Sequence, residues 1–145
     1  MSFVVTSVVA ASLPNAATAC SFSLQYGGKI ERNVTGLSNT DRLKLADLLI
    51  TVRNSAAKDG PVVIYGLADE RERDAQATAS KRAQSVSDYL KSLGVTASRI
   101  NIDTKIWRDR SQVPVSERNQ IEVEFEPACG PGGCENPCGT TEPKK

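Results

Sequence analysis

One segment, residues 61–95, limits the possible folds of this chain more than any other: PVVIYGLADERERDAQATASKRAQSVSDYLKSLGV. It opens with the apolar run Val62–Tyr65, which predicts a buried strand that Gly66 ends. A charged turn follows, and then a helix with one apolar stripe at steps of three and four residues. The residues of that stripe are Ala79, Ala83, Val86, Leu90 and Leu93. Gly94 can take the left-handed conformation that ends such a helix, so the segment predicts a βα unit.

Two opposite charges stand on either side of the turn. Asp69 lies at the end of the predicted strand, and Arg82 flanks the apolar stripe, from which it can point back toward the strand end. Polar groups at the carboxyl end of such a strand are well placed to hold a ligand. The pair would suit a small zwitterion, with its ammonium on Asp69 and its carboxylate on Arg82. The simpler interpretation, two solvated surface charges or one local ion pair, stays open.

The flanking sequence predicts three more strands and a second helix. Residues 22–26 (FSLQY), 99–104 (RINIDT) and 120–126 (QIEVEFE) alternate between apolar and polar side chains. Ser38 and Asp41 have the spacing of a capping box at the start of a helix. The apolar stripe of that helix consists of Leu45, Leu48, Leu49 and Val52. The order βαβαβ-β predicts an α/β (α+β) two-layer sandwich, in which a mixed four-stranded sheet carries both helices on one face.

Composition excludes several classes of function. The 145 residues carry a net charge of +1 and 5% aromatic residues, which argues against a nucleic-acid partner. There is no histidine, so the commonest general base and metal ligand is absent. Without an activated nucleophile, the chain predicts a binding or structural domain and not an enzyme, with no metal and no cofactor.

The N-terminal segment predicts export. Residues 3–11 form an apolar run too short to span a bilayer, and Ala17–Ala19 fits a cleavage site, although no Lys or Arg precedes the run. We therefore expect a signal peptide over residues 1–19, a domain over residues 20–128 and a Cys/Gly/Pro-rich tail over residues 129–145, with no transmembrane span in the mature chain. Lipid attachment at the residue after the cleavage site, an edge strand and a disordered tail are the alternatives for this segment.

Four cysteines support the export hypothesis, because an oxidising compartment would pair them. They are Cys20, Cys129, Cys134 and Cys138. Two disulfides are the main expectation, and four cysteines allow three ways to form them. A metal site is the sharper alternative, but three closely spaced cysteines without histidine do not match a zinc motif. Free or lipid-modified thiols are the third possibility, and Cys20 is the candidate for the lipid.

Several segments together resemble the OmpA-like (OmpA/MotB C-terminal) domain family, over most of the chain. They are Gly66–Asp69 (GLAD), Ser80–Leu90 (SKRAQSVSDYL), Leu93–Val95 (LGV), Ser98–Ile100 (SRI) and Arg118–Glu122 (RNQIE). The corresponding family patterns are G-H-T-D, L-S-x-x-R-A-x-x-V-x-x-Y-L, G-V-x-x-x-R-I and N-R-R-V-E. The match in the helix is close.

The resemblance implies a periplasmic or outer-membrane-associated domain that binds the diaminopimelate-containing peptide stem of peptidoglycan. Asp69 and Arg82 match the residues that hold diaminopimelate in the family, and Asn119 matches the Asn of the last motif. The family also places the last strand antiparallel between the first and second strands. That arrangement would bring Cys20 close to Cys129 and leave Cys134 to pair with Cys138.

Three departures from the family pattern lie near the expected ligand. Leu67–Ala68 replaces His-Thr, the loop after Asp69 is shorter and lacks the family's Gly and Asn, and Gln120 replaces an Arg. These departures motivate a second hypothesis from another class, in which the fold has lost the peptidoglycan pocket and serves as a structural or protein-interaction module. Envelope proteins would then be its partners.

Overall fold

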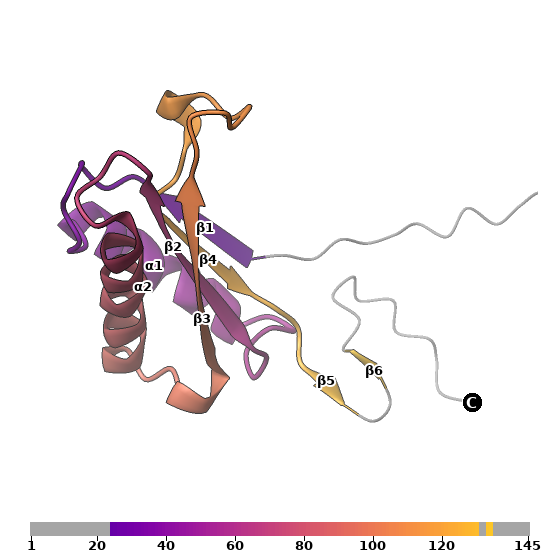
Figure 1. Cartoon of the computed structure of the whole chain (residues 1–145). Helices are drawn as coiled ribbons and strands as arrows, with labels where there is room; N and C mark the ends of the chain where they lie inside the picture. Colours follow the sequence, from indigo (N-terminus) through magenta and orange to yellow (C-terminus); the bar gives the residue numbers. More distant parts are fainter. Residues whose placement is uncertain (1–23, 131–132, 135–145) are drawn as a thin grey trace, which may run out of the picture.

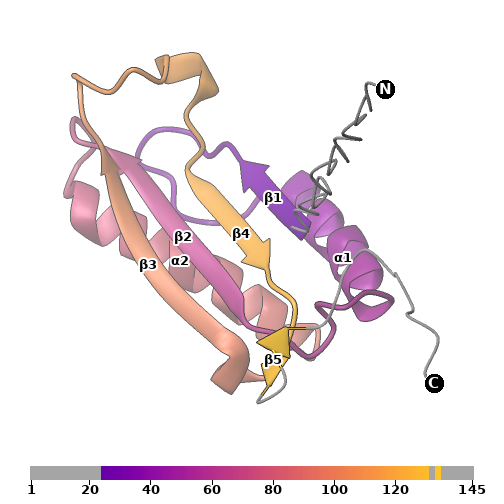
Figure 2. The same cartoon turned by 90° about the vertical axis from the view of Figure 1, so that its right-hand side faces the viewer.

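The computed structural model describes residues 24–130 and 133–134. The strands and helices, in chain order, are β1 (Leu24–Gly28), α1 (Asn39–Arg53), β2 (Val62–Asp69), α2 (Ala75–Ser92), β3 (Ile100–Trp107), β4 (Ile121–Phe125), β5 (Cys129–Gly130) and β6 (Gly133–Cys134). Short 3-10 turns at Ala97–Arg99 and Val115–Glu117 precede β3 and β4. Both long helices pack on one face of the sheet, as Figures 1 and 2 show, which confirms the predicted two-layer sandwich. None of the helices in this part of the chain has the length and apolar character that crossing a membrane requires.

The main sheet has the strand order β1-β4-β2-β3. β4 is antiparallel to both of its neighbours, whereas β2 and β3 are parallel. Ile64 in the centre of β2 stands opposite Val123 on one side and Ile102 on the other. The position of the last strand between the first two therefore agrees with the expectation from the family. Because β2 and β3 are parallel, their carboxyl ends meet at one edge of the sheet.

Helix α1 begins at the predicted capping box. The Asp41 backbone N–H donates to Ser38 Oγ at 3.0 Å, and the Ser38 N–H donates to Asp41 Oδ2 at 3.1 Å. The Tyr26 hydroxyl also donates to Asp41, so the cap ties the helix to β1. Burial and these contacts raise the pKa of Tyr26 above its usual value. The cap thus fixes the direction in which the chain enters α1.

Helix α2 has a left-handed residue just before it and another just after it. Asp74, with φ of 45°, is the N-cap, and its carboxylate accepts a hydrogen bond from the Ala77 N–H at 3.3 Å. At the other end Gly94 has φ of 95°, as the sequence predicted, and the buried Val95 folds back so that its N–H bonds the Leu90 carbonyl at 3.0 Å. These two ends set the length of the helix that carries Arg82.

Three strand ends differ from the sequence prediction. β1 continues to Gly28 and does not end at Tyr26, because Gly27 and Gly28 pair with Glu122 and Ile121 of β4. The other two ends are those of β2 and β3.

Gly66 does not end β2, which continues to Asp69 because these residues stay paired with β3. Helix α2 packs directly against Gly66 and leaves no room for a side chain there. β3 continues to Trp107, three residues past the predicted end at Thr104, because it stays in register with the longer β2. The extensions of β2 and β3 carry side chains to the same edge of the sheet.

The core lies between the helices and the sheet. Its largest fully buried apolar side chain is Phe125 of β4. The other buried members of this cluster are Leu45, Leu49, Val52, Ala57, Val62, Ile64, Ala83, Val86, Leu90, Val95, Ile121 and Val123. Both predicted helix stripes and the apolar face of the last strand contribute to it, so the core holds the base of the site in place.

Candidate functional site

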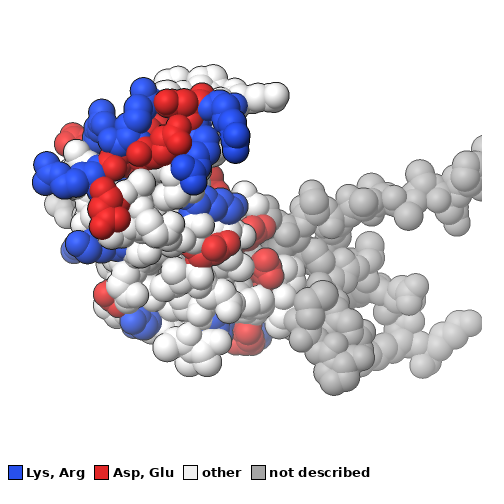
Figure 3. All heavy atoms as spheres, in the orientation of Figure 1, with Lys and Arg blue, Asp and Glu red and all other residues white. Residues whose placement is uncertain are grey.

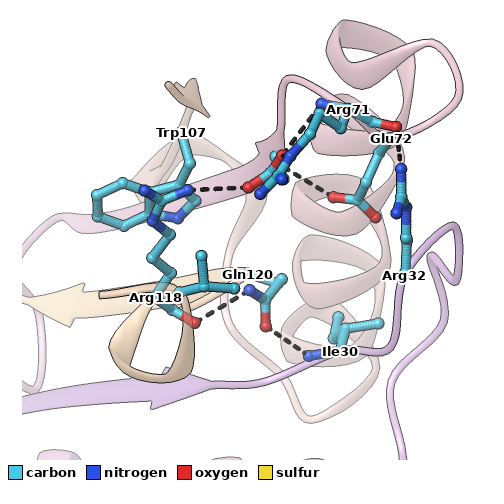
Figure 4. A pocket seen from close by; sticks show the side chains of 9 residues that line it. Ile30, Arg32, Arg71, Glu72, Trp107, Arg118 and Gln120 are labelled. Carbon is cyan, nitrogen blue, oxygen red and sulfur yellow. Dashed lines mark hydrogen bonds and ion pairs between the residues drawn. The ribbon is translucent and has the colours of Figure 1, made fainter. Parts of the chain in front are cut away.

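A cavity of about 280 Å³ opens at the carboxyl end of β2, where the predicted site lies. Figure 4 shows it between the loop after β1, the loop after β2 and the segment that leads into β4. Its lining residues are Ile30, Arg32, Asp69, Arg71, Glu72, Trp107, Val115, Arg118 and Gln120. This volume is near the lower end of the range for small-molecule sites, roughly 300–1,000 Å³. It suits a group the size of one amino acid.

The ends of β2 and β3 position the floor of the cavity. Asp69 is the last residue of β2 and pairs in register with Trp107, the last residue of β3. The Glu70 N–H donates to the Trp107 carbonyl at 2.9 Å and closes this edge of the sheet. Asp69 therefore stands on a rigid strand end, as the sequence predicted.

Two arginines bind the Asp69 carboxylate. Oδ1 accepts from the Arg71 N–H at 3.1 Å and from Arg71 Nε at 3.0 Å, and Oδ2 accepts from Arg118 Nη1 at 2.9 Å. The hydrogen bond from Arg71 holds the pKa of Asp69 below its usual value. A carboxylate has about four acceptor sites, and three are used here. Asp69 therefore keeps one acceptor site at the cavity wall.

Arg82 is closed to any ligand in this structure. Its side chain is 0% exposed, it does not line the cavity, and it makes no hydrogen bond or ion pair with Asp69. Nε donates to the Val34 carbonyl at 2.9 Å, Nη1 donates to the Leu67 carbonyl at 2.9 Å, and Nη2 donates to the Glu31 carbonyl at 3.0 Å. The two remaining donors bind Glu72. All five guanidinium N–H groups thus have partners within the chain.

Glu72 is the counterion of Arg82, and both of its carboxylate oxygens are also fully hydrogen-bonded. Its two oxygens accept from Arg82 Nη1 at 2.7 Å and Nη2 at 2.6 Å, a two-pronged contact. They also accept from the Asp69 N–H at 2.9 Å and the Asn33 N–H at 2.8 Å. The Glu72 side chain is only 4% exposed. The contact that the sequence analysis assigned to a ligand carboxylate is therefore made by a carboxylate of the protein itself.

Glu72 also makes the stability of the domain depend on pH. Burial raises the pKa of Glu72, but the hydrogen bonds from Arg82 and from two backbone N–H groups outweigh burial and hold the pKa below its usual 4.5. The unfolded chain then binds more protons than the folded chain as the pH falls through that range. The contribution of Glu72 is thus present above about pH 4.5 and is lost on acidification.

We expect Glu72→Gln to lower the unfolding free energy by about 2–3 kcal/mol at pH 7, because the buried guanidinium loses its counterion. Urea unfolding between pH 3 and pH 7 measures this. The parent and the variant should converge as the pH falls, since the parent carboxylate becomes protonated. Parallel stability curves for the two proteins would contradict the assignment.

Trp107 and Arg118 hold the segment between β3 and β4 against the cavity. Trp107 Nε1 donates to the Asn119 carbonyl at 2.8 Å, and the Arg118 guanidinium lies 5.6 Å from the centre of the Trp107 ring. Arg118 also donates to the carbonyls of Val113 and Arg108 at 3.0 and 3.2 Å. Trp107 thus anchors this segment and is also part of the cavity wall.

The Asn119 side chain lies outside this cavity. Its Nδ2 donates to Glu122 Oε1 at 3.2 Å, in a separate hollow that Tyr65 also lines. Gln120 takes the place at the cavity instead, where its Oε1 accepts from the Ile30 N–H at 3.0 Å. Of the three predicted ligand residues, the structure places only Asp69 at the cavity, with Arg82 buried behind Glu72.

Charged side chains of both signs gather at this end of the molecule, as Figure 3 shows. Arg71 Nε lies 3.3 Å from Asp109 Oδ1, and Arg108 Nη1 lies 3.3 Å from Glu70 Oε2. The mixture of acids and bases gives the rim no large field of one sign. Within residues 24–130 and 133–134, no cluster of three or more His, Cys, Asp or Glu residues could hold a metal ion.

Sequence reasoning missed Glu72, Arg118 and the two rim arginines, Arg32 and Arg71. The run DERERD alternates acids and bases, and nothing in it indicates which side chain turns inward. A signal was nevertheless present, because a guanidinium beside an apolar helix stripe needs a carboxylate partner if it is buried. The loop after β2 places Glu72 Oε2 2.7 Å from Arg82 Nη1.

The cysteine predictions fall mainly outside the described residues. Cys20 and Cys138 lie there, as do the signal peptide and most of the tail. The backbone of Cys129 stands opposite that of Cys134 in the small β5–β6 ladder. The disulfide pairing stays a prediction.

Comparison with known families gives a direct match. The model of the OmpA family matches residues 31–124, which include every cavity-lining residue except Ile30 and most of the sheet. The chain therefore belongs to the OmpA family, as its motifs indicated. No protein with a curated description matches the sequence.

Solved structures support the same fold. The OmpA-like domain of FopA1 from Francisella tularensis is 19% identical with a TM-score of 0.58, over 70% of each chain. The cell wall anchor of the T6SS from Pseudomonas aeruginosa is 17% identical with a TM-score of 0.54, over 72% of this chain and 80% of that one. The periplasmic domain of Helicobacter pylori MotB is 15% identical with a TM-score of 0.55, over 72% and 81%. At these identities the likeness shows the fold alone.

Proposed function

We propose that this chain is a non-catalytic domain of the cell envelope that binds peptidoglycan through the cavity at the end of β2. The observation that carries the proposal is the cavity itself, which has the size of one amino acid and has Asp69 in its wall. The Asp69 carboxylate keeps one acceptor site there. It would accept an ammonium group of the ligand in a charge-assisted hydrogen bond.

Membership of the OmpA family supports the same class of ligand and a periplasmic or outer-membrane-associated location. Among the similar structures, one is described as a cell wall anchor and another as a periplasmic domain. The ammonium group that we assign to Asp69 is that of diaminopimelate in the peptide stem. No catalytic step is part of the proposal, because the cavity is lined by no histidine, cysteine, serine or lysine.

The closed Glu72–Arg82 pair favours a second candidate function. If ligand binding requires Arg82, then the Glu72 side chain already occupies the place of the ligand carboxylate. The domain would in that case keep the fold as a structural module or as a binding partner for other envelope proteins. A binding test on peptidoglycan separates these two functions.

The test is co-sedimentation of the full chain with insoluble peptidoglycan. We expect the parent to sediment, and Asp69→Asn to bind about tenfold more weakly because it loses a charged hydrogen bond to the ligand. Asn keeps the shape and part of the hydrogen bonding, so the contact with Arg118 is disturbed least. Asp59→Asn is the matched control, since Asp59 is exposed and precedes β2 at its other end. A folded parent that stays in solution would favour the second candidate.

A further inference from the structure

We propose that a ligand carboxylate is held in this cavity by Arg32 and Arg71 at the rim, and not by the buried Arg82. The inference rests on the proposed function and specifies its ligand as a zwitterionic amino-acid group with a free carboxylate. Arg32 comes from the loop after β1, and Arg71 comes from the loop after β2. Both line the cavity, and Figure 4 shows them on the side opposite Trp107.

Arg82 is a poor carboxylate site because Glu72 already occupies it. A ligand carboxylate would have to displace a side chain that makes four hydrogen bonds. Glu72 is tethered beside the guanidinium, so its effective concentration there is at least in the millimolar range that short tethers give. Displacement would also leave the buried Glu72 charge without its guanidinium counterion, which is strongly unfavourable. The ligand carboxylate is therefore expected to bind elsewhere in the cavity.

The rim arginines have the donors that Arg82 lacks. Arg32 uses Nη2 on the Arg71 carbonyl, and Arg71 uses Nε on Asp69 and Asp109. Within the described ranges, 24–130 and 133–134, their remaining guanidinium N–H groups make no hydrogen bond or ion pair with the protein. The Arg71 side chain is 54% exposed. Planar guanidinium groups bind a carboxylate through two parallel hydrogen bonds, so the pair is suited to this role.

The placement of Asp69 determines the class of ligand. Its Oδ2 keeps the free acceptor site, and Oδ1 of the same carboxylate accepts from Arg71 Nε at 3.0 Å, so the acceptor for an ammonium and the donors for a carboxylate are adjacent. That spacing fits an ammonium and a carboxylate attached to one carbon. Ile30, Trp107 and Val115 give the cavity apolar walls, which suit the aliphatic part of the same ligand.

The two loops that supply these arginines are joined to each other. The Arg73 N–H donates to Asn33 Oδ1 at 2.8 Å, and the Asn33 N–H donates to Glu72 at 2.8 Å. Arg32 adds the contact to the Arg71 carbonyl that Figure 4 marks. The Glu72–Arg82 pair thus has a positioning role at the rim, because it binds both loops: Glu72 accepts from Asn33, and Arg82 donates to the carbonyls of Glu31 and Val34.

The experiment measures binding of the full chain to peptidoglycan whose diaminopimelate carboxylate is either free or amidated. The variants are Arg32→Ala, Arg71→Ala and the double variant. Arg73→Ala is the control, because it removes an equal charge from a neighbouring exposed residue that does not line the cavity. We expect each single variant to bind the free form about fivefold more weakly, and the double variant more than tenfold. The parent should prefer the free form, and the double variant should lose that preference.

Each alternative outcome has a definite meaning. If the parent binds and the double variant binds equally well with the same preference, the rim assignment is overturned while the proposed function stands. If the folded parent binds neither form, the proposed function fails, and the rim assignment fails with it. If Arg73→Ala weakens binding as much as the rim variants do, the effect is general electrostatics and the specific assignment is overturned.

Discussion

Replacing Arg82 by Ala is expected to lower the unfolding free energy of the domain by about 3–5 kcal/mol. The substitution removes five hydrogen bonds and leaves the Glu72 carboxylate buried without its counterion. For a domain of this size the loss corresponds to a fall in Tm on the order of 20 °C. Urea unfolding and a thermal scan measure both quantities.

Two further variants make the Arg82 experiment specific. Lys81→Ala is the matched control, because Lys81 is an exposed cation on the neighbouring position of α2 and should change the unfolding free energy by less than about 0.5 kcal/mol. Glu72→Ala combined with Arg82→Ala should recover part of the loss, since no buried charge is left unpaired. A cost below about 1 kcal/mol for Arg82→Ala would show that Arg82 is not the buried anchor described above.

Replacing Gly66 by Ala is expected to destabilise the domain by about 1–3 kcal/mol. A methyl group at this position would clash with the carbonyl oxygen of Ala79 and lie 2.9 Å from the Ala83 side chain. The first of these is backbone, so it cannot move away by a rotamer change. Helix α2 would have to shift from the sheet, and Arg82 would move with it. Denaturant unfolding of the purified variant measures the cost.

Gly36→Ala is the control for the Gly66 experiment. A side chain at Gly36 would meet no atom within 4 Å, so this change should be neutral or slightly stabilising. If the two variants unfolded at the same urea concentration, the close approach of α2 to β2 would not be a real constraint. The comparison thus separates the cost of the steric clash at Gly66 from the general effect of replacing a glycine by alanine.

The fold could be predicted from the sequence because its signals are local or periodic. The apolar stripe of α2, the Ser38–Asp41 box and the left-handed Gly94 all depend on residues within a few positions of one another. The alternation in residues 120–126 likewise predicted which face of β4 is buried. The order of the strands came from the family resemblance, and the structure agrees with it.

The site could be predicted only in part, because its contacts join residues far apart in the sequence. Asp69 was placed correctly at a strand end, since that position follows from β2 alone. The burial of Arg82 depends on the carbonyls of Glu31 and Val34, in a loop nearly fifty residues earlier. No periodicity encodes that loop, so the closed pair with Glu72 emerged only from the structure.

The most direct test of the whole account is an NMR titration of the ¹⁵N-labelled chain with a soluble peptide stem that ends in diaminopimelate. The single Trp107 indole, the Arg71 Nε–H and the buried Arg82 Nε–H report on the wall, the rim and the closed pair. We predict that the Trp107 and Arg71 signals shift with the ligand while the Arg82 signal stays in place. A shift of the Arg82 signal as large as that of Arg71 would contradict the account, because it would mean that the ligand displaces Glu72.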